Sequence, residues 1–166
     1  MLFKNEPPED SDYFGPVSYS HNLLRVFEAV NAGEDNETAR RFYWKAATSV
    51  HHGESTDTPA AEILEAAGID TSYASAFDDE SWDAVIREKM DAGLALVGND
   101  VGTPLIAFEK DSGEKIGIFG PVISRKPEGE QGVALWDAMV TMSTMDDFWE
   151  LKRTRTIGPD FGDPPD

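Results

Sequence analysis

The sequence predicts an α/β protein in which a long helical region is followed by one antiparallel β-hairpin and a final helix. Three observations support this class. Apolar residues recur at helical spacing as far as Gly98. Two short apolar runs, residues 105–108 and 115–119, then flank a turn-forming stretch, which is the pattern of a hairpin. Helical spacing returns after Pro127.

The helical region contains several separate amphipathic segments. The clearest begins at Ala39, where apolar residues follow the spacing i, i+3, i+4, i+7, i+8 and i+11 up to Val50 and form one face of a helix. Prolines suit the first turn of a helix and glycines suit its end, so these residues indicate the boundaries. We expect helices over residues 16–33, 35–53, 59–68 and 78–98, with an irregular helical turn over 70–77.

Composition limits the classes of function. A chain of 166 residues suits one domain, with room for a subdomain. Cysteine is absent, which excludes disulfides, thiolate metal sites and a cysteine nucleophile carried by this chain. The formal charge of −18 disfavours nucleic acid as a partner. We see no signal peptide and no apolar run near the roughly 20 residues that cross a bilayer, and therefore expect a cytoplasmic protein without membrane contact.

The predicted hairpin needs more strands than the rest of the chain offers. Two strands alone are marginally stable, and both are apolar enough to require two covered faces. The short apolar start, residues 1–4, is interpreted as the end of a further strand. A disordered terminus is the alternative at this position.

The turn before the hairpin is the best candidate for a binding site. Pro104 stands where the first strand begins, a position that tolerates a residue unable to donate to the ladder. A Thr103–Pro104 bond there is also a plausible cis peptide. The alternative is a proline with a purely structural role.

Four sequence blocks occur in order and carry a family resemblance. They are VGTP at 101–104, FGPV at 119–122, LWD at 135–137 and FWELKRTRT at 148–156. In this order and spacing they resemble the cytoplasmic, mycothiol-dependent reductases, nitroreductase-like, of the DsbA family. That family has a thioredoxin fold with a helical domain inserted before a cis-proline turn, a hairpin and a helix.

The resemblance implies a partial thioredoxin-like, DsbA-like fold with a large all-helical insertion. On this interpretation residues 1–4 are the remnant of a strand, 5–98 the helical insertion, 99–156 the C-terminal half of the thioredoxin fold, and 157–166 a tail. It further implies that Gly102, Thr103 and Pro104 bind the thiol substrate, with the backbone of Thr103 pairing in β-fashion.

The chain departs from the family pattern at its redox centre. Family members carry a Cys-Pro-Trp-Cys motif at a helix start, where the helix N-terminus favours a thiolate, whereas this chain has no cysteine. We therefore expect a chain truncated upstream of Met1, itself redox-inactive and without catalytic residues or a bound cofactor. Mycothiol is the co-substrate that the family implies. A naturally complete, cysteine-free helper is the alternative.

A competing function is a non-catalytic binding or assembly module. Such a module would dock another chain, or a second copy of itself, through the open edge of the hairpin. The partner is then either a homodimer mate or the segment missing from the N-terminus.

Other groups of polar residues have a structural interpretation that we prefer. Adjacent His51 and His52 diverge on a helix and are interpreted as solvating a helix end rather than binding metal. His21 has no evident partner. Acidic stretches at 78–80 and 146–147 suit helix starts, where the dipole stabilises negative charge. The basic stretch 152–155 is expected to pack on the sheet or pair with acidic neighbours, and Trp136 and Trp149 are expected in the core.

Overall fold

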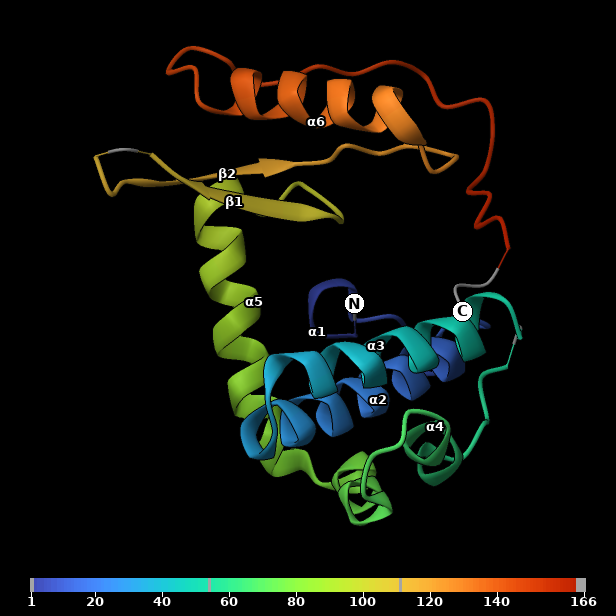
Figure 1. Ribbon diagram of the computed structural model, residues 1–166. Coiled ribbons are helices and arrows are strands. Elements are labelled where there is room, and N and C mark those ends of the chain that lie inside the picture. The colour runs from blue at the N-terminus through green and yellow to red at the C-terminus, as the bar shows by residue number, and fades with distance from the viewer. Residues whose placement is uncertain (1, 54, 111, 164–166) are drawn as a thin grey trace. The chain divides into compact units, whose positions relative to one another are not determined.

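The computed structural model describes residues 2–53, 55–110 and 112–163 and is a mixed, mostly helical structure with one two-stranded antiparallel sheet (Figure 1). The chain divides into two compact units between Glu88 and Lys89. No helix among the described residues is both long and apolar enough to cross a membrane. The elements are α1 (Leu2–Asn5), α2 (Phe14–Gly33), α3 (Asn36–His51), α4 (Ala60–Ala66), η1 (Thr71–Asp78), η2 (Glu80–Trp82), α5 (Asp83–Val97), β1 (Leu105–Glu109), β2 (Lys115–Phe119) and α6 (Gly129–Ser143).

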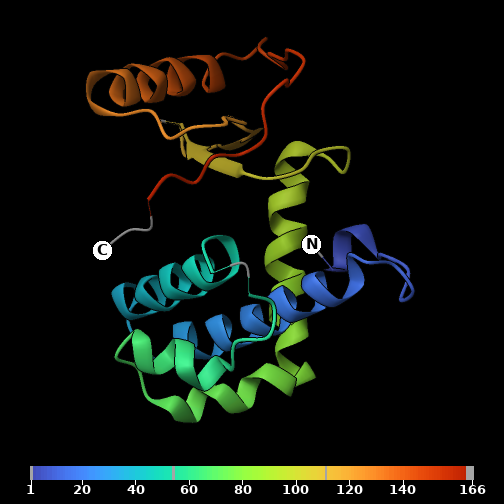
Figure 2. The same ribbon diagram turned by 90° about the vertical axis from the view of Figure 1, so that its right-hand side faces the viewer.

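The first unit is built from packed helices around an apolar core. Helix α2 contacts both α3 and η1, and α4 contacts η1 (Figure 2). The Asp35 carboxylate accepts a hydrogen bond from the Thr38 N–H at 2.8 Å and caps the start of α3. The side chains that are most completely buried lie on α2, α3 and α4: Phe42, Leu64, Val26 and Val30.

The strand predicted for residues 1–4 is not a strand in the structure, which forms the helical turn α1 at Leu2–Asn5. Met1 lies outside the described residues. A strand needs a neighbour for its hydrogen bonds, whereas a helical turn supplies its own, here from the Glu6 N–H to the Leu2 carbonyl at 2.9 Å. Phe3 fixes the turn by packing its ring edge against His21, with the ring centroids 4.4 Å apart.

In the second unit the hairpin is covered on both faces by helices. The register pairs Ala107 with Gly117 and Phe108 with Ile116, and successive side chains point to opposite faces. On one face Gly117 lies against the last turn of α5. On the other, the rings of Phe108 and Trp136 on α6 have centroids 6.0 Å apart. The predicted requirement for two covered faces is therefore met within the unit, with α5 supplying one of the covers.

This packing explains why the boundary between the units falls inside α5 and not after residue 98 as the sequence suggested. A Cβ on Gly117 would lie 2.6 Å from the Leu96 Cβ and 2.8 Å from the Val97 Cγ1. A Cβ on Gly93 would lie 3.5 Å from a Leu105 methyl. The second half of the helix thus belongs to the hairpin unit.

The two tryptophans expected in the core are exposed. Trp136 is 52% exposed even though it contacts Phe108, and Trp149 is 86% exposed in the irregular segment after α6. Their exposure has one physical reason: the described part of the second unit has no further element packed over α6 or over this segment.

Candidate functional site

The turn at Thr103–Pro104 links the end of α5 to β1. The helix ends at Val97. Gly98 follows with a φ of +88°, a backbone conformation that side chains disfavour, and its N–H donates to the Leu94 carbonyl at 2.8 Å. The Thr103–Pro104 peptide bond is cis. The Pro104 carbonyl accepts a hydrogen bond from the Gly120 N–H at 2.9 Å. This bond extends the hairpin by one pair beyond its last strand residues and fixes the turn to the end of β2.

Two of the four sequence blocks meet at this end of the hairpin. The register places Leu105 opposite Phe119, so the residues just before β1 lie beside those just after β2. A Cβ on Gly102 would be 3.6 Å from the Phe119 ring, which brings the backbone of the turn close to that aromatic side chain. Gly120 has a φ of +106° and is joined to Pro121 by a second cis bond.

The three residues that the sequence assigned to thiol binding, Gly102, Thr103 and Pro104, are thus neighbours in one exposed turn. Among the described residues the backbone N–H and C=O of Thr103 have no hydrogen-bond partner. One free donor and one free acceptor on the same residue can pair with an extended ligand in the manner of an added strand. The turn therefore offers backbone pairing beside an aromatic ring, but no thiol.

The first unit contains a buried polar cluster that sequence reasoning did not identify. Asp83, at the start of α5, accepts hydrogen bonds from Arg25 Nε at 2.7 Å and Arg25 Nη2 at 2.8 Å, and its Oδ1 lies 2.9 Å from His21 Nε2. His21 and Arg25 are 4% and 8% exposed. The hydrogen bond from Arg25 holds the pKa of the Asp83 carboxyl below its ordinary value, with burial acting in the opposite direction.

A sequence signal for this cluster exists, although it is weak. His21 and Arg25 are four residues apart and therefore lie on the same side of α2, on a helix whose other inward residues are mostly apolar. Identifying the cluster also requires its carboxylate, and Asp83 is 62 residues from His21 in the sequence, so no local pattern connects the two. The cluster joins α2 to the start of α5 and has a structural role.

The other histidines considered as metal ligands, His51 and His52, lie at one end of a helix. His51 is the last residue of α3 and His52 follows it as the C-cap. In the part of the chain that the structure describes, no three or more His, Asp or Glu side chains gather in an arrangement suited to a metal ion.

The acidic stretches have two different roles. The Asp79 carboxylate accepts a hydrogen bond from the Ser81 N–H at 2.9 Å and caps η2, as the sequence suggested. Asp146 instead pairs with Lys110 Nζ at 2.7 Å, and this hydrogen bond lowers the pKa of the Asp146 carboxyl.

The basic stretch, residues 152–155, is exposed along its length. Among the described residues its three basic side chains, Lys152, Arg153 and Arg155, form no ion pair. The predicted packing on the sheet or pairing with acidic neighbours is therefore not found.

The family described as Rv2466c-like, mycothiol-dependent nitroreductase Rv2466c, matches this chain over residues 8–153. The match includes the whole of the turn and three of the four sequence blocks in full. It covers most of the 166 residues.

Proposed function

The chain belongs to the Rv2466c-like family of mycothiol-dependent nitroreductases, and from this membership we propose that it is the thiol-binding portion of a DsbA-like, thioredoxin-fold reductase. The observation that carries the proposal is the exposed Thr103, whose backbone is free to pair beside Phe119 at the end of the hairpin. A hairpin covered by one helix on each face is compatible with half of a thioredoxin-like sheet.

The chemistry of the proposed reaction determines which of its groups this chain supplies and which come from elsewhere. Thiol–disulfide exchange requires a thiolate that attacks a sulfur atom, and this chain supplies none. The Thr103 N–H donates to a carbonyl of the low-molecular-weight thiol, its C=O accepts from an amide N–H, and the Phe119 ring covers the apolar side. Mycothiol supplies the reducing equivalents as co-substrate. The attacking cysteine is provided by a polypeptide segment outside this sequence, and the chain alone is redox-inactive.

The site of that complementary segment is the hairpin's open edge. In the described structure β1 and β2 pair only with each other, so each has a free edge that can accept another strand. The family also favours the cytoplasm as the location, because thiols there are kept reduced.

Activity and binding are tested separately. Mycothiol-dependent reduction of an added disulfide substrate, followed by the NADPH that a recycling system consumes to return mycothiol disulfide to mycothiol, should show no turnover with the purified chain above the background without it, and such turnover would contradict the assignment of the cysteine to another segment. Binding of mycothiol disulfide should shift the amide NMR signals of Thr103 and Gly120. Thr103→Pro removes the donor together with its amide signal and should abolish the shift of the Gly120 signal, whereas Thr103→Val keeps the backbone and should preserve both shifts. Equal binding by both variants would contradict the role of Thr103.

A second function is favoured by the apolar surface of the second unit. Among the described residues of this unit, ten large apolar side chains are exposed, including those of Val133 and Trp149. We propose as the alternative that the chain is a non-catalytic assembly module that dimerises through its open sheet edge. The solution mass distinguishes the two: a stable dimer supports assembly, and a folded monomer at high concentration argues against it.

A further inference from the structure

Residues 157–162, which we call the C-terminal strap, return to the second unit and are hydrogen-bonded there. The Asp160 N–H donates to the Ser124 carbonyl at 2.6 Å, and the Ser124 hydroxyl donates to the Ile157 carbonyl at 2.9 Å. Figure 1 shows this stretch, in red, returning past α6 to the connection between β2 and α6. The strap lies outside residues 8–153, the part of the chain that matches the family.

Ser124 provides most of the attachment. Its hydroxyl and its carbonyl each bond to a different residue of the strap. The Asp160 Oδ2 also lies 3.0 Å from Arg125 Nε, but these side chains are 49% and 78% exposed, and such pairs contribute little. The other carboxylate oxygen, Asp160 Oδ1, accepts from the Gly162 N–H at 3.1 Å and closes the strap into a turn. The strap therefore depends chiefly on the two Ser124 hydrogen bonds.

The same connection is bonded at its start to the thiol-binding turn, residues 102–104. Gly120 is buried, and its N–H donates to the Pro104 carbonyl at 2.9 Å. In the described structure, the hydrogen bonds that join residues 120–127 to other segments go only to Pro104 and to the strap. Pro121 stands between these two attachments, and its ring fixes φ, which limits how the connection can bend. A displacement of Ser124 therefore acts on the bond between Gly120 and Pro104.

We propose that the strap holds the thiol-binding turn in its binding conformation and that Ser124 is the positioning residue. While the strap is bonded to Ser124, the connection stays against the end of the hairpin and the Gly120 N–H stays bonded to Pro104. When the strap is released, Gly120 is the remaining attachment and its bond opens more often. The part of this inference that concerns binding rests on the proposed function, whereas the coupling of strap and turn is observable without a ligand.

Hydrogen exchange of the backbone amides measures this coupling in the full chain. The double variant Ser124→Ala with Asp160→Pro removes both donors that attach the strap. Exchange of the Gly120 N–H should become about ten-fold faster or more. The Lys110 N–H is the internal reference, because it donates to the Glu114 carbonyl at 2.9 Å at the opposite end of the hairpin. Its rate should not change. An unchanged Gly120 rate, or equal acceleration of both amides, would overturn the proposal.

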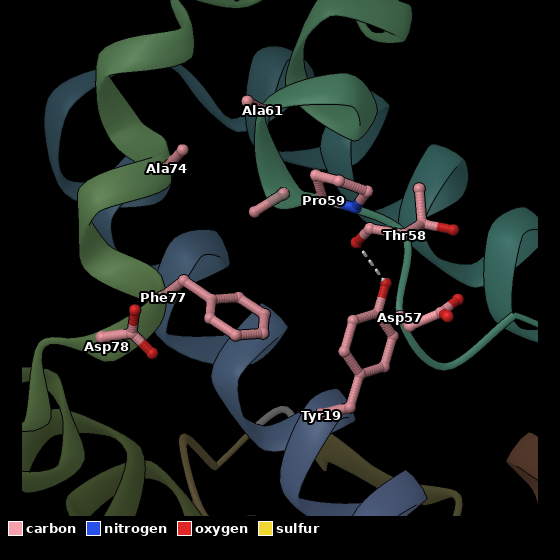
Figure 3. A pocket seen from close by; sticks show the side chains of 9 residues that line it. Tyr19, Asp57, Thr58, Pro59, Ala61, Ala74, Phe77 and Asp78 are labelled. Carbon is pink, nitrogen blue, oxygen red and sulfur yellow. Dashed lines mark hydrogen bonds between the residues drawn. The ribbon is translucent and has the colours of Figure 1, made fainter.

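Two single variants are the controls. Tyr19→Phe removes a hydroxyl that donates to the Thr58 carbonyl at 2.8 Å across a hollow of the first unit (Figure 3), so it deletes the same kind of bond elsewhere. Asp160→Ala keeps the N–H of that residue and removes only its carboxylate, and should change the Gly120 rate less than about two-fold. Acceleration in Tyr19→Phe equal to that in the double variant would contradict a local coupling. The same acceleration in Asp160→Ala would contradict the role of Ser124.

Mycothiol disulfide tests the link to binding. A ligand that binds only the closed turn should slow Gly120 exchange in the wild-type chain and in the double variant, about ten-fold at ten times the dissociation constant. A ligand that shifts the Thr103 amide signal and leaves Gly120 exchange unchanged would contradict a role of the strap in binding. Failure of the wild-type chain to bind would overturn the proposed function and not the coupling, which the exchange of Gly120 in the free chain decides.

Discussion

The two units of this chain bury their apolar side chains very differently. Among the described residues, fourteen buried apolar side chains lie in the first unit and one, Met139, in the second. The large exposed apolar side chains show the reverse distribution, with four in the first unit and ten in the second. Apolar area removed from water is the main stabilising term in folding. The first unit therefore holds the core of this chain, and the second presents its apolar surface.

The comparison bears on where the proposed recognition would take place. All four sequence blocks that carry the family resemblance lie in the second unit. A large exposed apolar surface commonly marks an interaction site. The proposed recognition of thiol ligands and of complementary strands therefore falls in the second unit, and not in the unit that holds the core.

The largest effect we predict comes from the same substitution made in each unit. Leu64 is fully buried in the first unit, so Leu64→Ala should lower the free energy of unfolding by about 4 kcal/mol. Leu151 is 78% exposed in the second unit, and Leu151→Ala should change it by less than about 0.5 kcal/mol. Urea unfolding followed by circular dichroism measures both. A similar loss in the two variants would mean that Leu151 is covered in solution, for example in a dimer.

The buried polar cluster should be the next most sensitive position in the first unit. Asp83→Asn keeps the shape of the side chain but leaves the Arg25 guanidinium, 8% exposed, without a carboxylate. We expect a loss of about 3 kcal/mol, at the low end for a buried ion pair because Asp83 keeps some exposure.

The control for Asp83 is an exposed pair of similar geometry. Arg40 and Glu37 on α3 are 2.9 Å apart with both side chains largely exposed, and Glu37→Gln should have little effect on stability. If Glu37→Gln destabilised the chain as much as Asp83→Asn, the burial of the cluster would not be the reason for its contribution.

In the second unit, the contact between α5 and β2 should be the most sensitive to added volume. Gly117→Ala places a methyl group against Leu96 and Val97, and should cost about 2 kcal/mol. Gly158→Ala is the matched control, since nothing lies within 4 Å of its Cβ position. The fluorescence of Trp136 and Trp149 reports this unit. A Gly117→Ala variant as stable as Gly158→Ala would show that α5 does not pack on the hairpin as described.

The sequence predicts those features of this structure that are determined by residues close together along the chain. Helical periodicity predicts α2, α3 and α5, and the Asp-Ser-Gly turn between two apolar runs predicts the hairpin. The same local patterns place Gly102, Thr103 and Pro104 together in one turn.

The remaining features depend on tertiary partners that no local pattern reveals. Residues 2–5 form a helical turn because Phe3 packs on His21, and His21 is satisfied by a carboxylate far along the chain. Trp149 is exposed although its type favours burial, since the described structure places no element over it. Exposure and burial of single residues were therefore the least predictable features.

The smallest effect we predict is the dependence of the Asp83 contribution on pH. The Arg25 hydrogen bond lowers the pKa of Asp83 in the folded state, so the carboxylate stabilises the fold fully at pH values above the unfolded pKa of about 3.9. This contribution is lost as pH falls through the lower, folded value. The difference in unfolding free energy between the wild-type chain and Asp83→Asn should therefore be constant from pH 7 to about 5 and shrink towards pH 3. A difference that grows on acidification would mean that the folded pKa of Asp83 is raised, and that burial outweighs the guanidinium in setting the charge of this cluster.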